Sequence, residues 1–93
     1  MHCRKDANHN AVERIFQQMG WITIDTSRCH GVLLDFIAYK TCGEVWFVEV
    51  KSGNKQLTVD ESLFVKLHHP ERSLVIHSVE EAKQICARLT ARF

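Results

Sequence analysis

The chain has 93 residues, of which 45% are hydrophobic and 25% are charged, and its formal net charge is +1. This length and composition are typical of one globular domain, covering residues 1–93, and they exclude a disordered or low-complexity chain. No apolar run is long enough to span a membrane, so we expect no membrane partner. The small net charge means that any nucleic-acid binding must come from local clusters of basic residues.

The first half of the chain predicts one helix followed by three strands. Apolar residues recur at helical spacing over residues 7–19, and Gly20 follows as a left-handed helix stop. Alternating patterns then predict three strands, at residues 21–25, 32–39 and 45–51.

The second half predicts a helix, a strand and a last helix. Thr58 and Glu61 form a capping box that starts the first of these helices, and Pro70 prevents its continuation. Its buried stripe is expected to contain Leu63, Phe64 and Leu67. Residues 73–78 predict a short strand.

The last helix repeats the capping signal, because Ser78 is followed three residues later by Glu81. Its apolar positions are Val79, Ala82, Ile85, Cys86 and Leu89. The resulting order, α-β-β-β-α-β-α, predicts an α/β fold in which helices flank a mixed sheet.

Compartment and cysteine usage give two further expectations. Residues 1–10 lack the apolar core of a signal peptide, so we expect a cytoplasmic location. The four cysteines show no Cys-x-x-Cys spacing, which indicates reduced thiols, and the paired spacings of structural zinc sites are also missing.

The segment FVEVKSG places two charged residues, Glu49 and Lys51, in an otherwise apolar strand. Side chains alternate along a strand, so both charges share one face, opposite Val48 and Val50. The alternation alone favours a face washed by solvent, because charged residues are rarely buried unless they are paired or bind a metal.

The turn at residues 40–44 predicts a hairpin, which would bring a third charged residue, Asp35, next to Glu49 and Lys51. If the turn is centred on Cys42, Asp35 faces Glu49 across the two strands. Facing carboxylates destabilise a sheet unless a cation lies between them, and the Val50 carbonyl is a natural third ligand for a divalent ion. A register slip of one residue would remove this pairing.

Asp35 followed by Glu49-Val50-Lys51 resembles the motif of the PD-(D/E)XK nuclease superfamily. Within it, the chain is most similar to small phage-encoded nucleases related to the virus-type replication-repair (VRR) domain and to archaeal Holliday junction resolvases. The similarity covers nearly the whole chain and includes residues 5–9, which resemble RDANH, the segment HGVLLDF, EVKSG at 49–53, LT-x-D at 57–60 and SVEEA at 78–82.

The resemblance implies a restriction-endonuclease-like core and a role for each motif residue. Asp35 corresponds to the metal-binding aspartate and Glu49 to the second acidic ligand. Lys51 corresponds to the lysine that positions or activates the attacking water. The expected setting is a bacterial or phage-infected cell.

The chain also departs from the family pattern. Leu34 stands where the family has a proline, and an extra residue follows Gly31. His9, with Glu13 one turn further on, takes the place of the helix-one residue that completes the metal shell, and Glu61 replaces a frequent glutamine. His9, Glu13 and Glu61 are therefore candidates for an outer shell.

Phosphodiester hydrolysis needs the same residue types independently of the family. Two carboxylates and an ammonium can hold a cation, position a water and balance negative charge, and hard oxygen ligands favour Mg²⁺ or Mn²⁺. Arg28, Lys55 and Lys66 are candidates for contacts with a DNA backbone, although simple solvation also explains Arg28 and Lys66.

We therefore expect a metal-dependent DNA endonuclease that acts on branched DNA such as Holliday junctions. Two alternatives stay open: a non-catalytic nucleic-acid-binding module in which Glu49 and Lys51 form an ion pair, and an unrelated small α/β interaction protein in which Asp35 and Glu49 face water. A homodimer is also expected, because symmetric cutting of a junction requires two sites. The aromatic residues expected at its interface are Trp21, Trp46, Phe36 and Tyr39, unless helices cover them.

Overall fold

The order of helices and strands in the computed structural model is the predicted α-β-β-β-α-β-α. The structure describes residues 8–27, 34–51, 56–68 and 71–91, and of residues 67 and 68 it describes the backbone alone. The elements are α1 (His9–Gln18), β1 (Ile22–Asp25), β2 (Phe36–Tyr39), β3 (Val45–Val50), α2 (Val59–His68), β4 (Ser73–Ile76) and α3 (Val79–Thr90). Within these ranges, no helix has the length and apolar character needed to cross a membrane.

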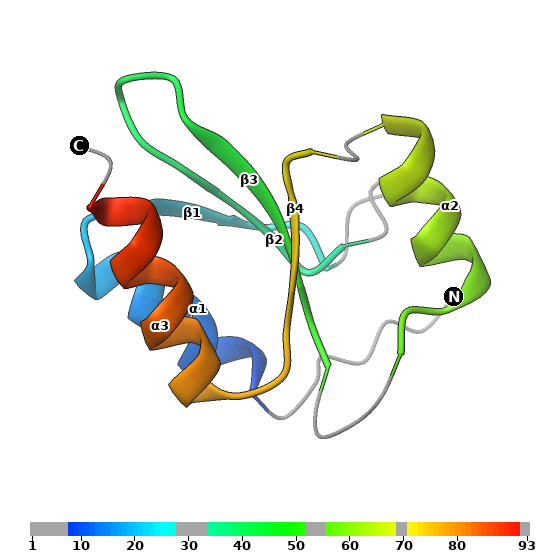
Figure 1. Cartoon of the computed structure of the whole chain (residues 1–93), viewed down its shortest axis with the longest axis horizontal. Coiled ribbons are helices and arrows are strands. Elements are labelled where there is room, and N and C mark those ends of the chain that lie inside the picture. The colour runs from blue at the N-terminus through cyan, green and yellow to red at the C-terminus, as the bar shows by residue number, and fades with distance from the viewer. Residues whose placement is uncertain (1–7, 28–33, 52–55, 69–70, 92–93) are drawn as a thin grey trace.

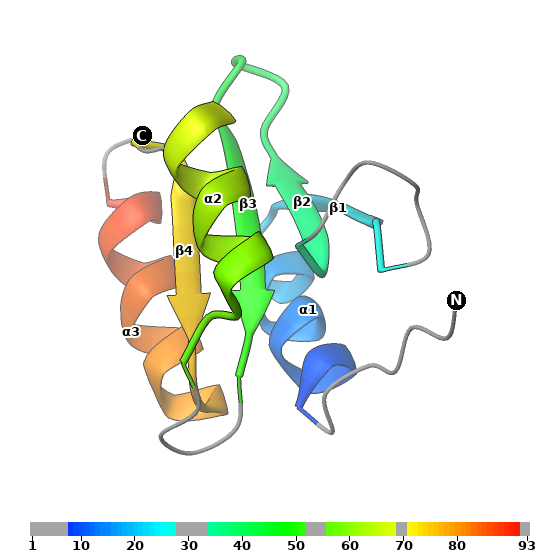
Figure 2. The same cartoon turned by 90° about the vertical axis from the view of Figure 1, so that its right-hand side faces the viewer.

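The four strands form one mixed sheet in the order β1-β2-β3-β4. β1 and β2 are antiparallel, as are β2 and β3, whereas β4 runs parallel to β3. Figure 1 shows α1 and α3 packed together on one face of the sheet and α2 on the opposite face. In Figure 2, where α2 faces the viewer, this helix lies over β3 and β4. The prediction of a mixed sheet flanked by helices is therefore confirmed.

From Phe36 to Tyr39, the register of the β2–β3 hairpin is the one predicted by a turn centred on Cys42. Tyr39 pairs with Val45 and Ile37 with Phe47. The turn closes through a hydrogen bond from the Lys40 amide to the Glu44 carbonyl, and Gly43 adopts a φ of 101° that other residues rarely reach. The hairpin thereby brings the start of β2 to the end of β3.

The core lies between the sheet and the pair α1 and α3. The rings of Phe16 and Phe36 meet edge to face with centroids 5.5 Å apart, and Phe16 also contacts Trp21. Trp21 and Phe36 are 3% and 0% exposed, so the expectation that they lie at an interface is wrong. Helix α1 covers both rings, which a sequence pattern alone does not show.

The ends of the helices follow the sequence signals closely. After α1, Gly20 has a φ of 90°, and the Trp21 amide donates to the Phe16 carbonyl. This hydrogen bond supplies a partner for a carbonyl of the last helical turn. At α2 the capping box is reciprocal, because Thr58 Oγ1 accepts from the Glu61 amide and Glu61 Oε1 accepts from the Thr58 amide.

Only one of the two hydrogen bonds of the capping box predicted for α3 is present. Ser78 Oγ accepts from the Glu81 amide, as expected. Glu81 Oε1 instead accepts from the His77 amide, one residue before the cap, and lies 3.3 Å from Nδ1 of the same histidine. The Glu81 carboxylate therefore contacts His77, the residue before the cap, and not the Ser78 amide that a complete capping box would use.

Helix α2 packs on the sheet through a narrow stripe. Phe64 contacts Phe47 of β3, with ring centroids 6.4 Å apart. Leu63 is 49% exposed, so its predicted burial is wrong, and the side chain of Leu67 lies outside the described residues. A helix that covers part of one face of a sheet buries fewer positions than its apolar sequence suggests.

Candidate functional site

Charged residues from five elements and their flanking residues gather at one end of the sheet. Antiparallel pairing places Asp25, at the end of β1, beside Phe36, and Phe36 beside Val48 near the end of β3. The starts of α1 and α2 lie toward the same end (Figure 2). The side chains that meet there are His9, Glu13, Asp25, Asp35, Glu49, Lys51 and Glu61.

Glu49 points toward α2 and is 4% exposed, so the solvent-washed face favoured by the alternation of β3 is not what the structure has. The reason is that α2 covers this part of the sheet. Burial, together with the negative charges of Asp35 and Glu61, raises the pKa of Glu49 to about 9. Its Oε1 is buried and has no hydrogen-bond partner among the described residues.

Lys51 stands between two carboxylates. Its Nζ lies 3.3 Å from Glu49 Oε2 and 3.0 Å from Glu61 Oε1. Burial alone would lower the pKa of Lys51, but Glu61 and Glu49 raise it, so the ammonium stays charged. Its backbone amide donates to the Ile76 carbonyl of β4, which fixes the residue at the end of the sheet.

Glu61 reaches this lysine from the first turn of α2. Burial would raise the pKa of Glu61, but the Thr58 amide and then the contacts with Glu49 and Lys51 lower it. The same carboxylate therefore caps the helix and holds the ammonium. The sequence predicted Glu61 as an outer-shell candidate, and the structure places it in direct contact with Lys51.

Asp35 is fixed between β1 and β3. Its Oδ2 accepts from the Val50 amide at 2.7 Å, and its carbonyl accepts from the Thr26 amide. The predicted pairing of Asp35 with Glu49 does not form, because the Asp35 amide donates to the Val48 carbonyl and the strands shift register just before that pair. The two carboxylates still interact, since the charge of Asp35 contributes to the raised pKa of Glu49.

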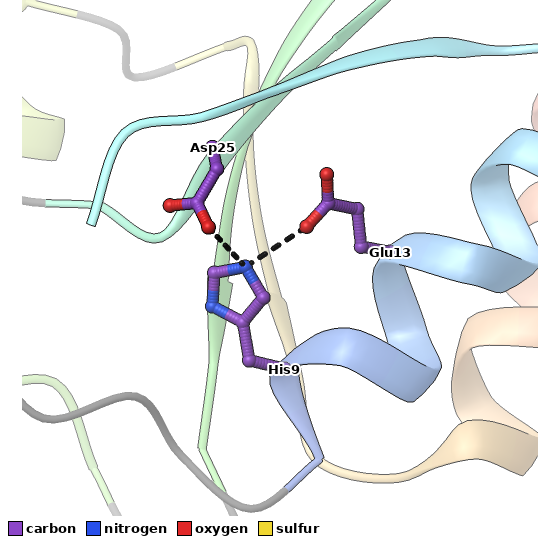
Figure 3. A group of neighbouring side chains, drawn as sticks. All are labelled: His9, Glu13 and Asp25. Atoms are coloured by element: carbon purple, nitrogen blue, oxygen red, sulfur yellow. Dashed lines mark hydrogen bonds and ion pairs between the residues drawn. The ribbon is translucent and has the colours of Figure 1, made fainter. Parts of the chain in front are cut away.

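On the other side of Asp35, the His9 ring lies among three carboxylates and is 0% exposed. Its Nδ1 is 3.6 Å from Asp35 Oδ1. Figure 3 shows its Nε2 directed at Glu13 Oε1, 3.1 Å away, and at Asp25 Oδ2, 3.8 Å away. Burial alone would lower the pKa of His9, but these neighbours, Asp35 first, raise it.

Sequence reasoning missed Asp25. The strand at residues 21–25 was predicted, but it was not paired with its neighbour, and the pairing is what places Asp25 beside the start of β2. The alternation of β1 and β2 could have supplied that register.

The structure describes only some of the remaining residues predicted from the sequence. Arg28 and Lys55, two of the candidates for DNA contacts, lie outside the described residues, whereas Lys66 is exposed on α2. The role of the Val50 carbonyl as a metal ligand stays a prediction. Cys42 and Cys86 are free thiols, the first exposed and the second buried.

No protein-family model matches the chain, and neither a curated protein nor a solved structure matches it. A proposal about function therefore depends on the chemistry of the residues at this end of the sheet and on the motif that they form in the sequence.

Proposed function

We propose that the protein is a metal-dependent endodeoxyribonuclease that hydrolyses phosphodiester bonds in branched DNA such as Holliday junctions. The observation that carries the proposal is the position of Lys51 beside the buried carboxyl of Glu49, whose pKa responds to the charge of Asp35. The resemblance of Asp35 and Glu49-Val50-Lys51 to the PD-(D/E)XK motif supports it. The α-β-β-β-α-β-α order is also compatible with a restriction-endonuclease-like core.

Asp35 and Glu49 are the residues that would hold Mg²⁺ or Mn²⁺. Glu49 fits this role because its Oε1 is buried without a hydrogen-bond partner among the described residues and its pKa is raised to about 9. A neighbouring divalent charge would favour the ionised carboxylate and offset its burial. When bound, such an ion neutralises phosphate oxygens and lowers the pKa of a coordinated water.

Lys51 supplies the positive charge that the reaction needs from the protein itself. An ammonium at this position can hold a water through its N–H groups and balance the negative charge that develops on the phosphate. Glu61 acts as a positioning residue, because it accepts from the same Nζ at 3.4 Å through Oε2 and anchors that Nζ near Glu49.

A non-catalytic nucleic-acid-binding module is the second candidate. It is favoured by the position of Lys51, whose Nζ lies 3.3 Å from Glu49 Oε2 and forms a 3.0 Å ion pair with Glu61, an arrangement that can hold the end of β3 against α2 without any reaction. The two candidates differ in their response to metal, since hydrolysis requires a divalent ion and binding to a phosphate backbone does not.

Branched and linear DNA of the same sequence, incubated with the protein in Mg²⁺ or in EDTA, would test the proposal. We expect cleavage of a four-way junction in Mg²⁺, little cleavage of the linear duplex, and none in EDTA. Binding without cleavage in Mg²⁺ and in Mn²⁺ would favour the non-catalytic module. Cleavage that is equal on both DNAs would retain the nuclease and contradict its selectivity for branches.

The proposal includes a homodimer, since two-fold symmetry supplies the two active sites that symmetric cutting of a junction requires. The aromatic residues Trp21 and Phe36 cannot form its interface because they are buried. Apolar side chains are instead exposed on β1, where Ile22 and Ile24 are 44% and 50% exposed. β1 is also an edge strand of the sheet, which is a common place for association.

A further inference from the structure

The group formed by His9, Glu13 and Asp25 has the composition and spacing of a metal site. Each residue offers one ligand atom, and these three atoms all lie within 4.8 Å of one another. Figure 3 shows that the ring of His9 points between the two carboxylates. The residues come from α1 and from the end of β1, so two separate elements fix the group.

We propose that this group binds a transition-metal dication such as Zn²⁺, at a site separate from the Mg²⁺ or Mn²⁺ site proposed at Asp35 and Glu49. The imidazole nitrogen of His9 determines which metal the group prefers. Nitrogen ligands favour zinc, whereas magnesium prefers oxygen ligands. The inference does not depend on nuclease activity.

The buried histidine is the observation that points to a ligand. His9 is 0% exposed, and its Nδ1 has no hydrogen-bond partner among the described residues. This Nδ1 faces Asp35 Oδ1, 3.6 Å away and just beyond hydrogen-bond distance, so a proton on Nδ1 would point at that carboxylate and leave Nε2 free of a proton. Nε2 then presents a lone pair toward two carboxylate oxygens. A cation among these three acceptors would satisfy all of them, and a small approach of Asp35 to Nδ1 would supply the outer hydrogen bond that metal-bound histidines usually make.

Each carboxylate of the group is anchored through its other oxygen. Glu13 Oε2 accepts from the Thr23 hydroxyl at 2.6 Å, and this hydroxyl accepts in turn from Gln17 Nε2. Asp25 Oδ1 accepts from both the amide and the hydroxyl of Ser27. The oxygens directed at His9 are therefore held in place, as metal ligands are by their outer partners.

The spacing suits zinc. Donor atoms at about 2.0 to 2.2 Å from a tetrahedral zinc ion lie about 3.3 to 3.6 Å from one another. The two distances from His9 Nε2, 3.1 Å to Glu13 and 3.8 Å to Asp25, require small movements at most. Three protein ligands leave one position of a tetrahedral ion open to water.

A proton on Nε2 is the competing occupant, because an imidazolium would also lie well among these carboxylates. Zinc binding must displace this proton. An isothermal calorimetric titration of the metal-free protein with Zn²⁺ alone, at neutral pH, shows whether zinc or a proton occupies the site.

The informative variant is Asp25→Asn. It keeps the oxygen that accepts from Ser27 and replaces the oxygen that faces His9 with an NH₂ group. We expect a loss of zinc affinity of about tenfold or more. Glu13→Gln, which keeps an acceptor for Thr23, should behave in the same way. Asp60→Asn is the matched control, since Asp60 is an exposed acid in the first turn of α2, and it should leave the affinity unchanged.

Glu49→Gln separates the two metal sites, because it alters the proposed Mg²⁺ site and should leave zinc affinity unchanged. A zinc-dependent shift of the His9 imidazole nitrogens in NMR spectra, assigned with His9→Gln, provides a second readout. Equal zinc affinity in the wild type and in both Asp25→Asn and Glu13→Gln would overturn the inference, as would a wild type that binds no zinc. A loss confined to Glu49→Gln would also overturn it, and would place the ion at the other site.

Discussion

Glu61, in the first turn of α2, places its Oε1 3.0 Å from Nζ of Lys51, the residue that follows β3. The helix that covers β3 and β4 thus does more than shield the sheet, because it carries the carboxylate that holds the ammonium. Glu61 also caps its own helix, so the position of Lys51 is coupled to the start of α2.

Glu61→Ala should lower cleavage of a four-way junction about tenfold, because Lys51 loses the carboxylate of α2 that holds its ammonium in place. Glu61→Gln should keep most of the activity, since a glutamine oxygen can still accept from Nζ. Thr58→Ala is the control: it removes one bond of the capping box but keeps the contact between Glu61 and Lys51. Single-turnover rates would measure all three, and an equal loss in Thr58→Ala would mean that helix capping explains the effect.

Glu49→Gln should stabilise the metal-free protein while it removes cleavage. The pKa of Glu49 in the folded protein, about 9, lies above its ordinary value of 4.5, so the folded state binds this proton more tightly than the unfolded state. The stability that depends on this proton is complete at low pH and is lost as pH rises through about 9. Glutamine mimics the protonated carboxyl at every pH, and Lys51 keeps Glu61 as its partner.

The advantage of Glu49→Gln over the wild type should therefore grow between pH 5 and pH 9, to about 1 to 3 kcal/mol. Urea unfolding at several pH values, without metal, measures it. Glu80→Gln serves as the control because Glu80 is exposed on α3. Parallel pH curves for the wild type and Glu49→Gln would contradict the burial of an acid with a raised pKa.

Mg²⁺ or Mn²⁺ should raise the melting temperature of the wild type. The gain in unfolding free energy should be about 1 to 3 kcal/mol at ten to a hundred times the dissociation constant. Asp35→Asn should abolish the gain without disturbing the fold, because an asparagine oxygen can still accept from the Val50 amide. A melting temperature that rises equally in both proteins would show that the ion binds elsewhere.

Much of the fold could be predicted because local rules decide it. A turn centred on Cys42 predicts the pairing of Tyr39 with Val45, and the spacing of Thr58 and Glu61 predicts the start of α2. These patterns depend on neighbours along the chain or across one tight turn, so a sequence contains them directly.

The burial of Glu49 could not be predicted in this way, because it depends on where α2 lies over the sheet. The grouping of Asp25 with His9 depends on the packing of α1 against the end of β1, which involves contacts between distant segments. The exposure of Leu63 has the same origin, since a helix can bury a residue only where the sheet beneath it extends.

If β1 forms the dimer interface, Ile24→Lys should convert a dimer into a monomer. Ile24 is 50% exposed on the edge strand, and a lysine there would bring two like charges together across a two-fold axis. Leu63→Lys is a matched control, because Leu63 is 49% exposed but lies on α2. Light scattering at micromolar concentration measures the assembly, and a monomeric wild type would refute the proposed dimer.

The most direct test of the nuclease proposal is single-turnover cleavage of a four-way junction by Lys51→Ala in Mg²⁺, with DNA binding measured on the same samples. Because Lys51 is proposed to act on the transition state, we predict a loss in cleavage rate of about 100-fold or more, with binding changed by about threefold at most. A variant that cuts the junction at the wild-type rate would contradict the role of Lys51 and, with it, the assignment of this end of the sheet as a nuclease site.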